Sequence, residues 1–237
     1  MTRTRNDPRI SICTLAEYAI ASPARRRSIL RDQRYPSAFI AAPFRDAYAA
    51  ATDVLLHDCD LRLIDEYLSE WRSRKPRTRF TDKASRLCVE AMTAFRALVA
   101  TGTFDGMRFL PGRREAYVPF AGVEVSVRPD ALIAGAKPGA VKLYIGKSVP
   151  LAEDAKHKFG SASYAGTLLH CWLESLFIDA AADDCLIVDV FARRVYRAPG
   201  RYVTRRRDLE AACQEIAAVW SAIPEPPGWA EAVAAGA

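Results

Sequence analysis

The sequence lacks the residue patterns that mark several common chemistries. Only 3 of the 237 residues are His, and no Cys-x-x-Cys pair or Cys/His cluster occurs, so a zinc site is not expected. No Ser-His-Asp or Cys-His arrangement stands out, which argues against a small-molecule enzyme that uses such a nucleophile. The tripeptide Gly146-Lys147-Ser148 lacks the upstream glycine of a phosphate-binding P-loop.

Long apolar runs are also missing. No stretch approaches 18 uninterrupted apolar residues, so the sequence predicts no membrane span. The basic opening MTRTRNDPRI leads into no signal-like apolar segment. The 6 cysteines are scattered among apolar residues, which is typical of buried free thiols in a reducing compartment. We therefore expect a cytoplasmic protein without a membrane partner.

Basic residues are abundant, and most of them are Arg. The net charge is +6, and the basic residues gather in short clusters. Arg suits bidentate contact with phosphate, and a positive face attracts DNA or RNA through counterion release. An Arg-rich and Ala-rich composition can also arise from a GC-rich genome, so both explanations stay open. The residues predicted to contact nucleic acid are Arg25, Arg26, Arg27, Arg74, Lys75, Arg77, Arg113 and Arg114.

The first hundred residues read as helices. Thr14 with Glu17 three residues later forms a capping box, and Pro23 is placed to open a second helix. Apolar residues at helical spacing continue through residues 44–71 and 82–101. The predicted organisation is a helical segment over residues 1–105, packed on an α/β core over residues 106–237 as one compact unit.

The stretch 117–147 carries the strands of that core. After a turn at Ala121-Gly122, three valines alternate with polar residues, which predicts a half-buried strand that ends at Pro129. Asp130 follows at once, and a later alternating run closes at Lys147. Carboxylates that bind a divalent ion, with a cation near the phosphate, are what metal-dependent phosphodiester cleavage requires. An Asp after Pro at a strand end is also ordinary turn chemistry, so both interpretations remain.

The remaining residues predict a helix, a buried strand, a return strand and a last helix. The helix is expected from Ser161 or Ser163 to about Ala182, with His170 off its apolar face and at least half exposed. The strand covers residues 185–191, the return strand covers 195–197, and Thr204 is expected to cap the last helix.

This order of elements, with Pro129-Asp130 and a following Lys, resembles the PD-(D/E)xK or restriction-endonuclease-like superfamily. The opening residues Thr14, Leu15, Tyr18, Ser22 and Pro23 are similar to the entry motif of its RecB-like nuclease branch. The resemblance implies an α/β (α+β) fold with an αβββαβ core and a helical N-terminal segment. It also implies Mg²⁺ or Mn²⁺ as the cofactor.

The resemblance assigns roles to four residues and shows one departure. Asp130 and Glu124 would hold the metal, and Lys142 or Lys147 would polarise water and phosphate. The acid expected two residues before the Lys is absent, because Ile145 precedes Lys147 and Ala140 precedes Lys142 at that spacing. Glu124, Glu115 and Glu17 are substitutes for the missing acid.

Two functions therefore remain open. The first is a nuclease-like protein that binds nucleic acid and is either catalytically impaired or a metal-dependent phosphodiesterase with a displaced carboxylate. The second is a non-catalytic scaffold or protein-interaction module that retains the nuclease fold. The two differ in whether a second acid lies beside Asp130.

Overall fold

The computed structural model describes residues 4–36, 44–74, 78–113, 116–146, 160–176 and 178–231, without the side chains of residues 79–81. The helices are α1 (Ile12–Ile20), α2 (Pro23–Arg34), α3 (Arg45–Leu56), α4 (Leu61–Ser73), α5 (Arg79–Val99), α6 (Ser161–Ser175) and α7 (Val203–Val219). The strands are β1 (Arg9–Ser11), β2 (Arg108–Pro111), β3 (Tyr117–Phe120), β4 (Val123–Ser126), β5 (Ala131–Ala134), β6 (Gly139–Tyr144), β7 (Cys185–Asp189) and β8 (Arg194–Arg197). Two 3₁₀ turns, η1 (Ala182–Asp184) and η2 (Trp220–Ala222), complete the described elements.

The first two helices begin at serine caps. Ser11, and not the predicted Thr14, is the N-cap of α1, and its Oγ accepts a hydrogen bond from the Thr14 N–H at 3.2 Å. Ser22 caps α2 in the same way, with Pro23 at the first helical position as the sequence predicted. The last helix differs from the prediction, because α7 begins at Val203 and has no side-chain cap.

A small sheet carries the predicted hairpin. Strands β3 and β4 pair antiparallel with Phe120 opposite Val123, and β1 adds in parallel on the other side of β4. The two turn residues, Ala121 and Gly122, have φ angles of 45° and 84°. Positive φ at both positions matches the right-handed twist of the strands, so the two-residue turn predicted at Ala121-Gly122 is confirmed.

A larger sheet has the order β2-β5-β6-β7-β8. Strands β5 and β6 form an antiparallel pair, whereas β6 and β7 are parallel and are connected through α6. Side chains of the central strands alternate between two separate cores. In β6, Ala140 and Tyr144 face one core, and Val141 and Leu143 face the other.

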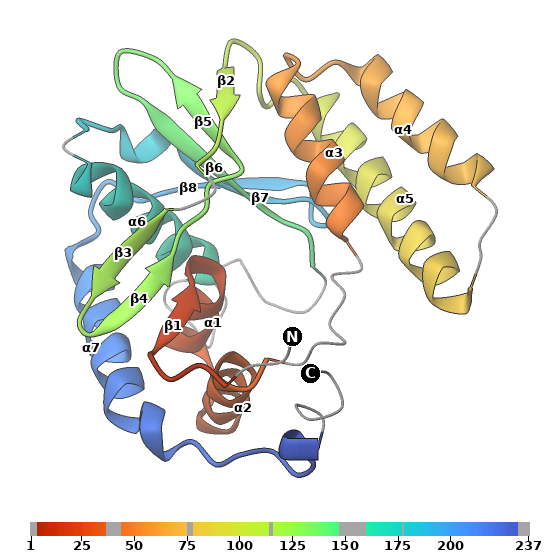
Figure 1. Ribbon diagram of the computed structural model, residues 1–237. Coiled ribbons are helices and arrows are strands. Elements are labelled where there is room, and N and C mark those ends of the chain that lie inside the picture. Colours follow the sequence, from red (N-terminus) through yellow and green to blue (C-terminus); the bar gives the residue numbers. More distant parts are fainter. Residues whose placement is uncertain are drawn as a thin grey trace.

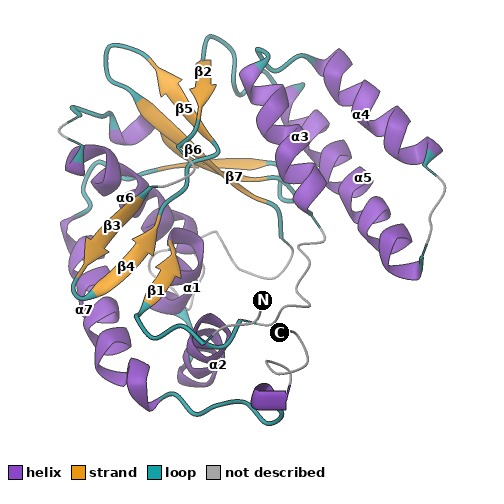
Figure 2. Cartoon of the chain, in the orientation of Figure 1, coloured by secondary structure: helices purple, strands orange, loops and turns teal. Residues whose placement is uncertain are grey.

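These two cores make a layered α/β molecule (Figures 1 and 2). One core joins the large sheet to α3, α4 and α5. The other joins it to α1, α2, α6, α7 and the small sheet. The mixed α/β class predicted from the sequence is confirmed. The helices of residues 1–105 divide between the two faces of the large sheet and do not form one block.

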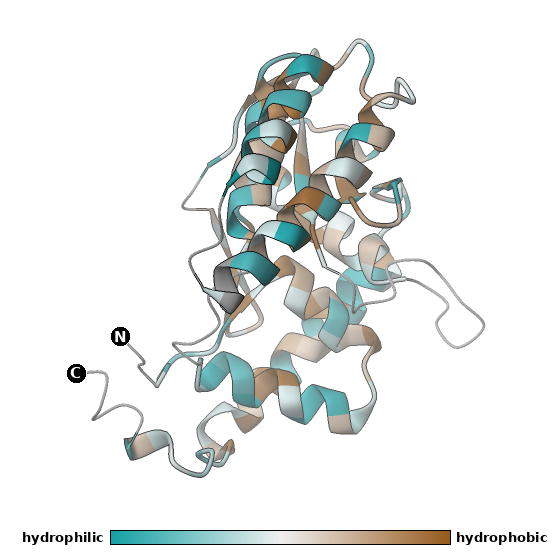
Figure 3. Cartoon of the chain, turned by 90° about the vertical axis from the view of Figure 1, so that its right-hand side faces the viewer, coloured by the Kyte–Doolittle hydropathy of each residue, from teal (hydrophilic) through white to brown (hydrophobic). Residues whose placement is uncertain are grey.

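The helices α3, α4 and α5 bury the apolar faces that their amphipathic sequences predict. Viewed from their side, hydrophilic and hydrophobic residues alternate along the helices of this layer (Figure 3). In α4, Ile64, Leu68 and Trp71 are buried at helical spacing. The turn between α3 and α4 has positive φ at Asp58 and Cys59, and this left-handed backbone separates the two helices.

The helix α6 differs from its prediction in length and in burial. It ends at Ser175 rather than near Ala182, and His170 is buried with 7% of its surface exposed. The prediction of an exposed or half-exposed His170 was wrong because α6 contacts α1 and α7 as well as strands of both sheets. An amphipathic pattern predicts that one face of a helix is buried. It does not show that other elements also cover the remaining faces of the helix.

Burial also agrees with the expected state of the cysteines. All six thiols are free, and Cys88, Cys171, Cys185 and Cys213 are buried, whereas Cys13 and Cys59 are of intermediate exposure. Among the residues described by the structure, no helix is both long and apolar enough to cross a membrane.

Candidate functional site

Asp130 and Lys142 meet where β5 and β6 begin to pair. Ala131 lies opposite Val141, and the Asp130 N–H donates to the Val141 carbonyl at 2.8 Å, so the pairing continues one residue beyond the strand. This register puts Asp130 beside Lys142. Lys142 Nζ lies 3.0 Å from Asp130 Oδ2, and the two side chains are 18% and 17% exposed. The sequence left open which lysine faces Asp130, and the structure shows that Lys142 does.

Both oxygens of the Asp130 carboxylate have protein partners. Oδ1 accepts from Lys142 Nζ at 3.2 Å, and Oδ2 accepts from the Leu143 N–H at 2.7 Å. Lys142 Nζ also donates to the carbonyl of Arg128 at 2.9 Å. An ammonium group has three N–H donors, so Lys142 keeps one donor that no described residue uses.

An open pocket of about 560 Å³ lies over this pair. Three of its lining residues are basic and one is acidic. The lining residues are Thr52, Leu56, Pro111, Gly112, Arg113, Arg128, Pro129, Asp130 and Lys142. Because Lys142 already neutralises Asp130, the two arginines leave the pocket positive. Such a pocket favours an anion over a cation.

Arg128 and Gly112 shape the pocket through the backbone. Arg128 has a φ angle of 42°, which is unusual for a residue without the freedom of Gly and more so before Pro129. Its guanidinium donates to the Tyr117 hydroxyl at 2.9 Å, and its carbonyl faces Lys142. A Cβ atom at Gly112 would overlap the Pro129 carbonyl oxygen, so only Gly lets these two loops touch.

Sequence reasoning missed Arg128, Gly112 and Thr52 as site residues. Arg128 could have been identified from the sequence as a site residue, because it directly precedes Pro129-Asp130. Gly112 and Thr52 reach the pocket from a separate loop and from α3, and no local sequence pattern joins them to Asp130.

Two of the expected acids lie in other ion pairs. Glu124 belongs to the small sheet and pairs with Arg9 at 3.1 Å, with its side chain 51% exposed. Glu17 pairs with Arg25 at 2.7 Å. Glu115 and Lys147 lie outside the described residues. No group of three or more His, Cys, Asp or Glu that could hold a metal occurs in the described part of the chain.

The two positions where the motif would carry its second acid are filled by apolar side chains. Ile145 is 4% exposed and lies in the core with α3, α4 and α5, and its N–H donates to the Tyr48 hydroxyl at 3.0 Å. Ala140 is fully buried in the opposite core. An acid at either position would require reorganisation of a packed core.

The donor set at Asp130 does not fit Mg²⁺ or Mn²⁺. Such ions take oxygen ligands and are held by carboxylates, carbonyls and water. The described residues offer one carboxylate, and the ammonium of Lys142 lies beside it. That ammonium fills the position beside the carboxylate where a metal ion would bind, and its positive charge repels the ion.

The predicted nucleic-acid contacts divide into paired and unpaired residues. Arg25 pairs with Glu17, Arg26 pairs with Glu215 at 2.9 Å, and Arg74 pairs with Glu70 at 2.6 Å. Arg27 lines a separate hollow between α2 and α7. Arg113 lines the pocket over Asp130, and no described residue pairs with it. Lys75, Arg77 and Arg114 lie outside the described residues.

Burial raises the pKa values of two other titratable groups near the Asp130–Lys142 pair. Burial raises the pKa of Cys13 to about 11, while the nearby charges of Lys142 and Asp130 act on it in opposite directions. Burial also raises the pKa of Tyr48 above its ordinary value. Neither group is therefore prepared to act as a nucleophile at neutral pH.

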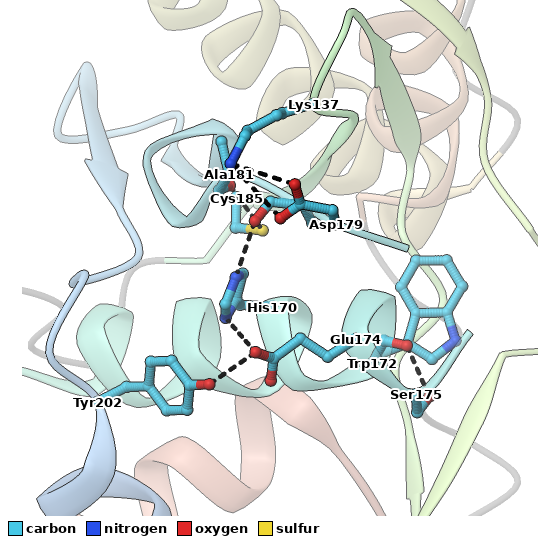
Figure 4. A network of polar contacts seen from close by, with 10 residues as sticks. Lys137, His170, Trp172, Glu174, Ser175, Asp179, Ala181, Cys185 and Tyr202 are labelled. Carbon is cyan, nitrogen blue, oxygen red and sulfur yellow. Dashed lines mark hydrogen bonds and ion pairs between the residues drawn. The ribbon is translucent and has the colours of Figure 1, made fainter. Parts of the chain in front are cut away.

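A second polar network surrounds His170 on α6 (Figure 4). Its Nε2 lies 3.2 Å from the Ala180 carbonyl, and its Nδ1 lies 3.9 Å from Glu174 Oε1. The same Glu174 oxygen accepts from the Tyr202 hydroxyl at 2.6 Å, and this hydrogen bond raises the pKa of Tyr202 to about 12. The network joins α6 to the loop before β7 and to the residue that precedes α7, which is a structural role.

Comparisons with known proteins do not assign this chain to a family. No protein-family model, no curated protein and no solved structure matches this chain. A proposal for the function therefore depends on the residues of the site and their geometry.

Proposed function

We propose that this protein binds nucleic acid through a nuclease-like core whose described residues form no catalytic metal site. The observation that carries the proposal is the Asp130–Lys142 pair, in which both carboxylate oxygens are satisfied by protein donors. A catalytic carboxylate of this kind would have to face a metal ion. Here Asp130 fixes the ends of β5 and β6 and orients Lys142 toward the pocket.

The order of elements supports a nuclease-like core as part of the proposal. If β4 and β5 count as one strand bent at Arg128 and Pro129, the chain runs from β3 through this strand to β6, then α6 and β7. The β5–β6 pair is antiparallel and the β6–β7 pair is parallel. This is consistent with the expected αβββαβ order, with Pro129-Asp130 and Lys142 on adjacent strands. The fold class alone carries no function, so the pocket supplies the rest.

The charge of the pocket favours phosphate. Arg113 offers five N–H donors, Arg128 offers those not used by Tyr117, and Lys142 offers one. Arginine donors match phosphate oxygens in pairs, and phosphate contacts supply most non-specific affinity for nucleic acids. The free thiols agree with the reducing cytoplasm as the proposed compartment.

A non-catalytic scaffold is the second candidate, and one observation favours it. Three of the predicted phosphate contacts, Arg25, Arg26 and Arg74, lie in ion pairs with acids of the same chain. If the whole positive surface is balanced in this way, the chain would have no affinity for nucleic acid.

Salt-dependent binding separates the two candidates. Binding of a fluorescent single-stranded DNA or RNA, followed by anisotropy in EDTA, should weaken as salt rises. Arg113→Ala should reduce the slope of log K against log salt by about 0.7, the share of one phosphate contact on a single strand. Arg74→Ala, which removes an Arg already paired with Glu70, is the matched control and should leave the slope unchanged. Absence of binding by the wild type at low salt would favour the scaffold.

A further inference from the structure

We infer that the pocket over Asp130 takes the terminal phosphate monoester of a nucleic-acid strand. The inference rests on the proposed function and specifies which part of the strand enters the pocket.

The charge of the described lining matches a monoester better than an internal diester. Arg113, Arg128 and Lys142 each carry one positive charge, and Asp130 carries one negative charge, which leaves a net charge of two. A phosphate monoester carries a charge of about −1.5 to −2 at neutral pH, whereas an internal phosphodiester carries one negative charge. A diester in the pocket would therefore leave one cation without a partner.

The available donors belong to residues that line one pocket. Lys142 Nζ is fixed by Asp130 and by the Arg128 carbonyl, so its remaining N–H has little freedom. The Arg128 guanidinium is anchored by the Tyr117 hydroxyl and lies over the Tyr117 ring. Arg113 has no partner among the described residues and is free to close on a bound anion. Thr52 adds a hydroxyl from α3.

The recessed floor favours the end of a strand. Asp130 and Lys142 are less than one-fifth exposed, and Thr52 and Leu56 of α3 line the pocket together with the loops at Gly112 and Pro129. A phosphate that reaches Lys142 must enter this hollow. A terminal phosphate has one attached nucleotide to accommodate, whereas an internal phosphate has two. The apolar surfaces of Leu56, Pro111 and Pro129 are suited to contact the sugar of that one nucleotide.

Three strands of one sequence test this inference. They carry a 5′-phosphate, a 3′-phosphate or hydroxyls at both ends, with a fluorophore in the middle, and binding is measured by anisotropy in EDTA. One phosphorylated strand should bind about tenfold more tightly than the hydroxyl strand, since charge-assisted bonds to three cations are added. The phosphorylated strand that binds more tightly shows whether the 5′ or the 3′ end is bound. This gain in affinity should shrink near pH 5, because the monoester loses its second charge at a pKa of about 6.

Pocket variants assign the effect to this site. Arg113→Ala should abolish the preference for the phosphorylated strand, and it should weaken the binding of the hydroxyl strand only by the share of one phosphate contact. Arg74→Ala should preserve the preference. Equal binding of all three strands by the wild type would overturn the inference while the proposed function stands. No binding of any strand would overturn both, and a preference that survives in Arg113→Ala would place the terminal phosphate elsewhere.

Discussion

Lys142 Nζ lies 3.0 Å from Asp130 Oδ2, across an antiparallel strand pair in which the Asp130 N–H also bonds to the Val141 carbonyl. The pair is more than four-fifths buried, and each partner has a further hydrogen bond to the backbone. A carboxylate and an ammonium arranged in this way stabilise the junction of β5 and β6 and hold the lysine toward a positive pocket.

Removal of either partner should destabilise the fold. Asp130→Asn leaves the Lys142 ammonium without its counterion, so the free energy of unfolding should fall by about 2 kcal/mol in urea. Lys142→Met should cost a similar amount, and the double variant should cost less than the sum of the two. Additive losses would show that the two side chains do not interact in solution.

Gly112 should not tolerate a methyl group. Gly112→Ala places a Cβ against the Pro129 carbonyl and the Asp130 backbone, so it should lower the free energy of unfolding by about 3 kcal/mol. Gly200→Ala is the matched control, because nothing lies within 4 Å of a Cβ at that position. If both variants unfold at the same urea concentration, the close approach of the two loops is wrong.

Arg128 should separate stability from binding. Arg128→Gly removes the guanidinium but suits the φ angle of 42°, so relief of about 1 kcal/mol of backbone strain should offset the lost bond to Tyr117. Urea unfolding should therefore change little, while anisotropy should show weaker binding of nucleic acid. A variant that unfolds more easily by several kcal/mol would mean that the Arg128 side chain, and not its backbone, maintains the pocket.

The sequence determined the strands and turns of this region well. Alternating valines and the Ala121-Gly122 turn predicted β3 and β4, although β4 ends at Ser126 and not at the predicted Pro129. It determined the site less well, because the identity of the facing lysine depends on the register between β5 and β6. Local pattern does not encode that register. The pocket also draws Thr52 and Gly112 from distant elements, and their roles exist only after the layers have packed.

The buried Asp189 should give a pH dependence of known sign. Burial raises its pKa above the ordinary value of 3.8, although its Oδ1 accepts from the Ala192 N–H at 3.0 Å. The protonated form is therefore favoured in the folded state, and its contribution to stability is lost as pH rises through the folded pKa. Asp189→Asn should be more stable than the wild type at pH 7, and the difference should shrink as pH falls toward 3.8. A difference that grows with falling pH would contradict this account.

Calorimetric titration with Mn²⁺ tests the central claim, that Asp130 forms an ion pair and not a metal site. Wild-type protein and Asp130→Asn are titrated side by side, with circular dichroism to establish that the variant is folded. We expect the same heat from both proteins, because Lys142 already occupies the position beside the Asp130 carboxylate. A binding isotherm in the wild type that disappears in Asp130→Asn would contradict it and would place a metal ion on Asp130.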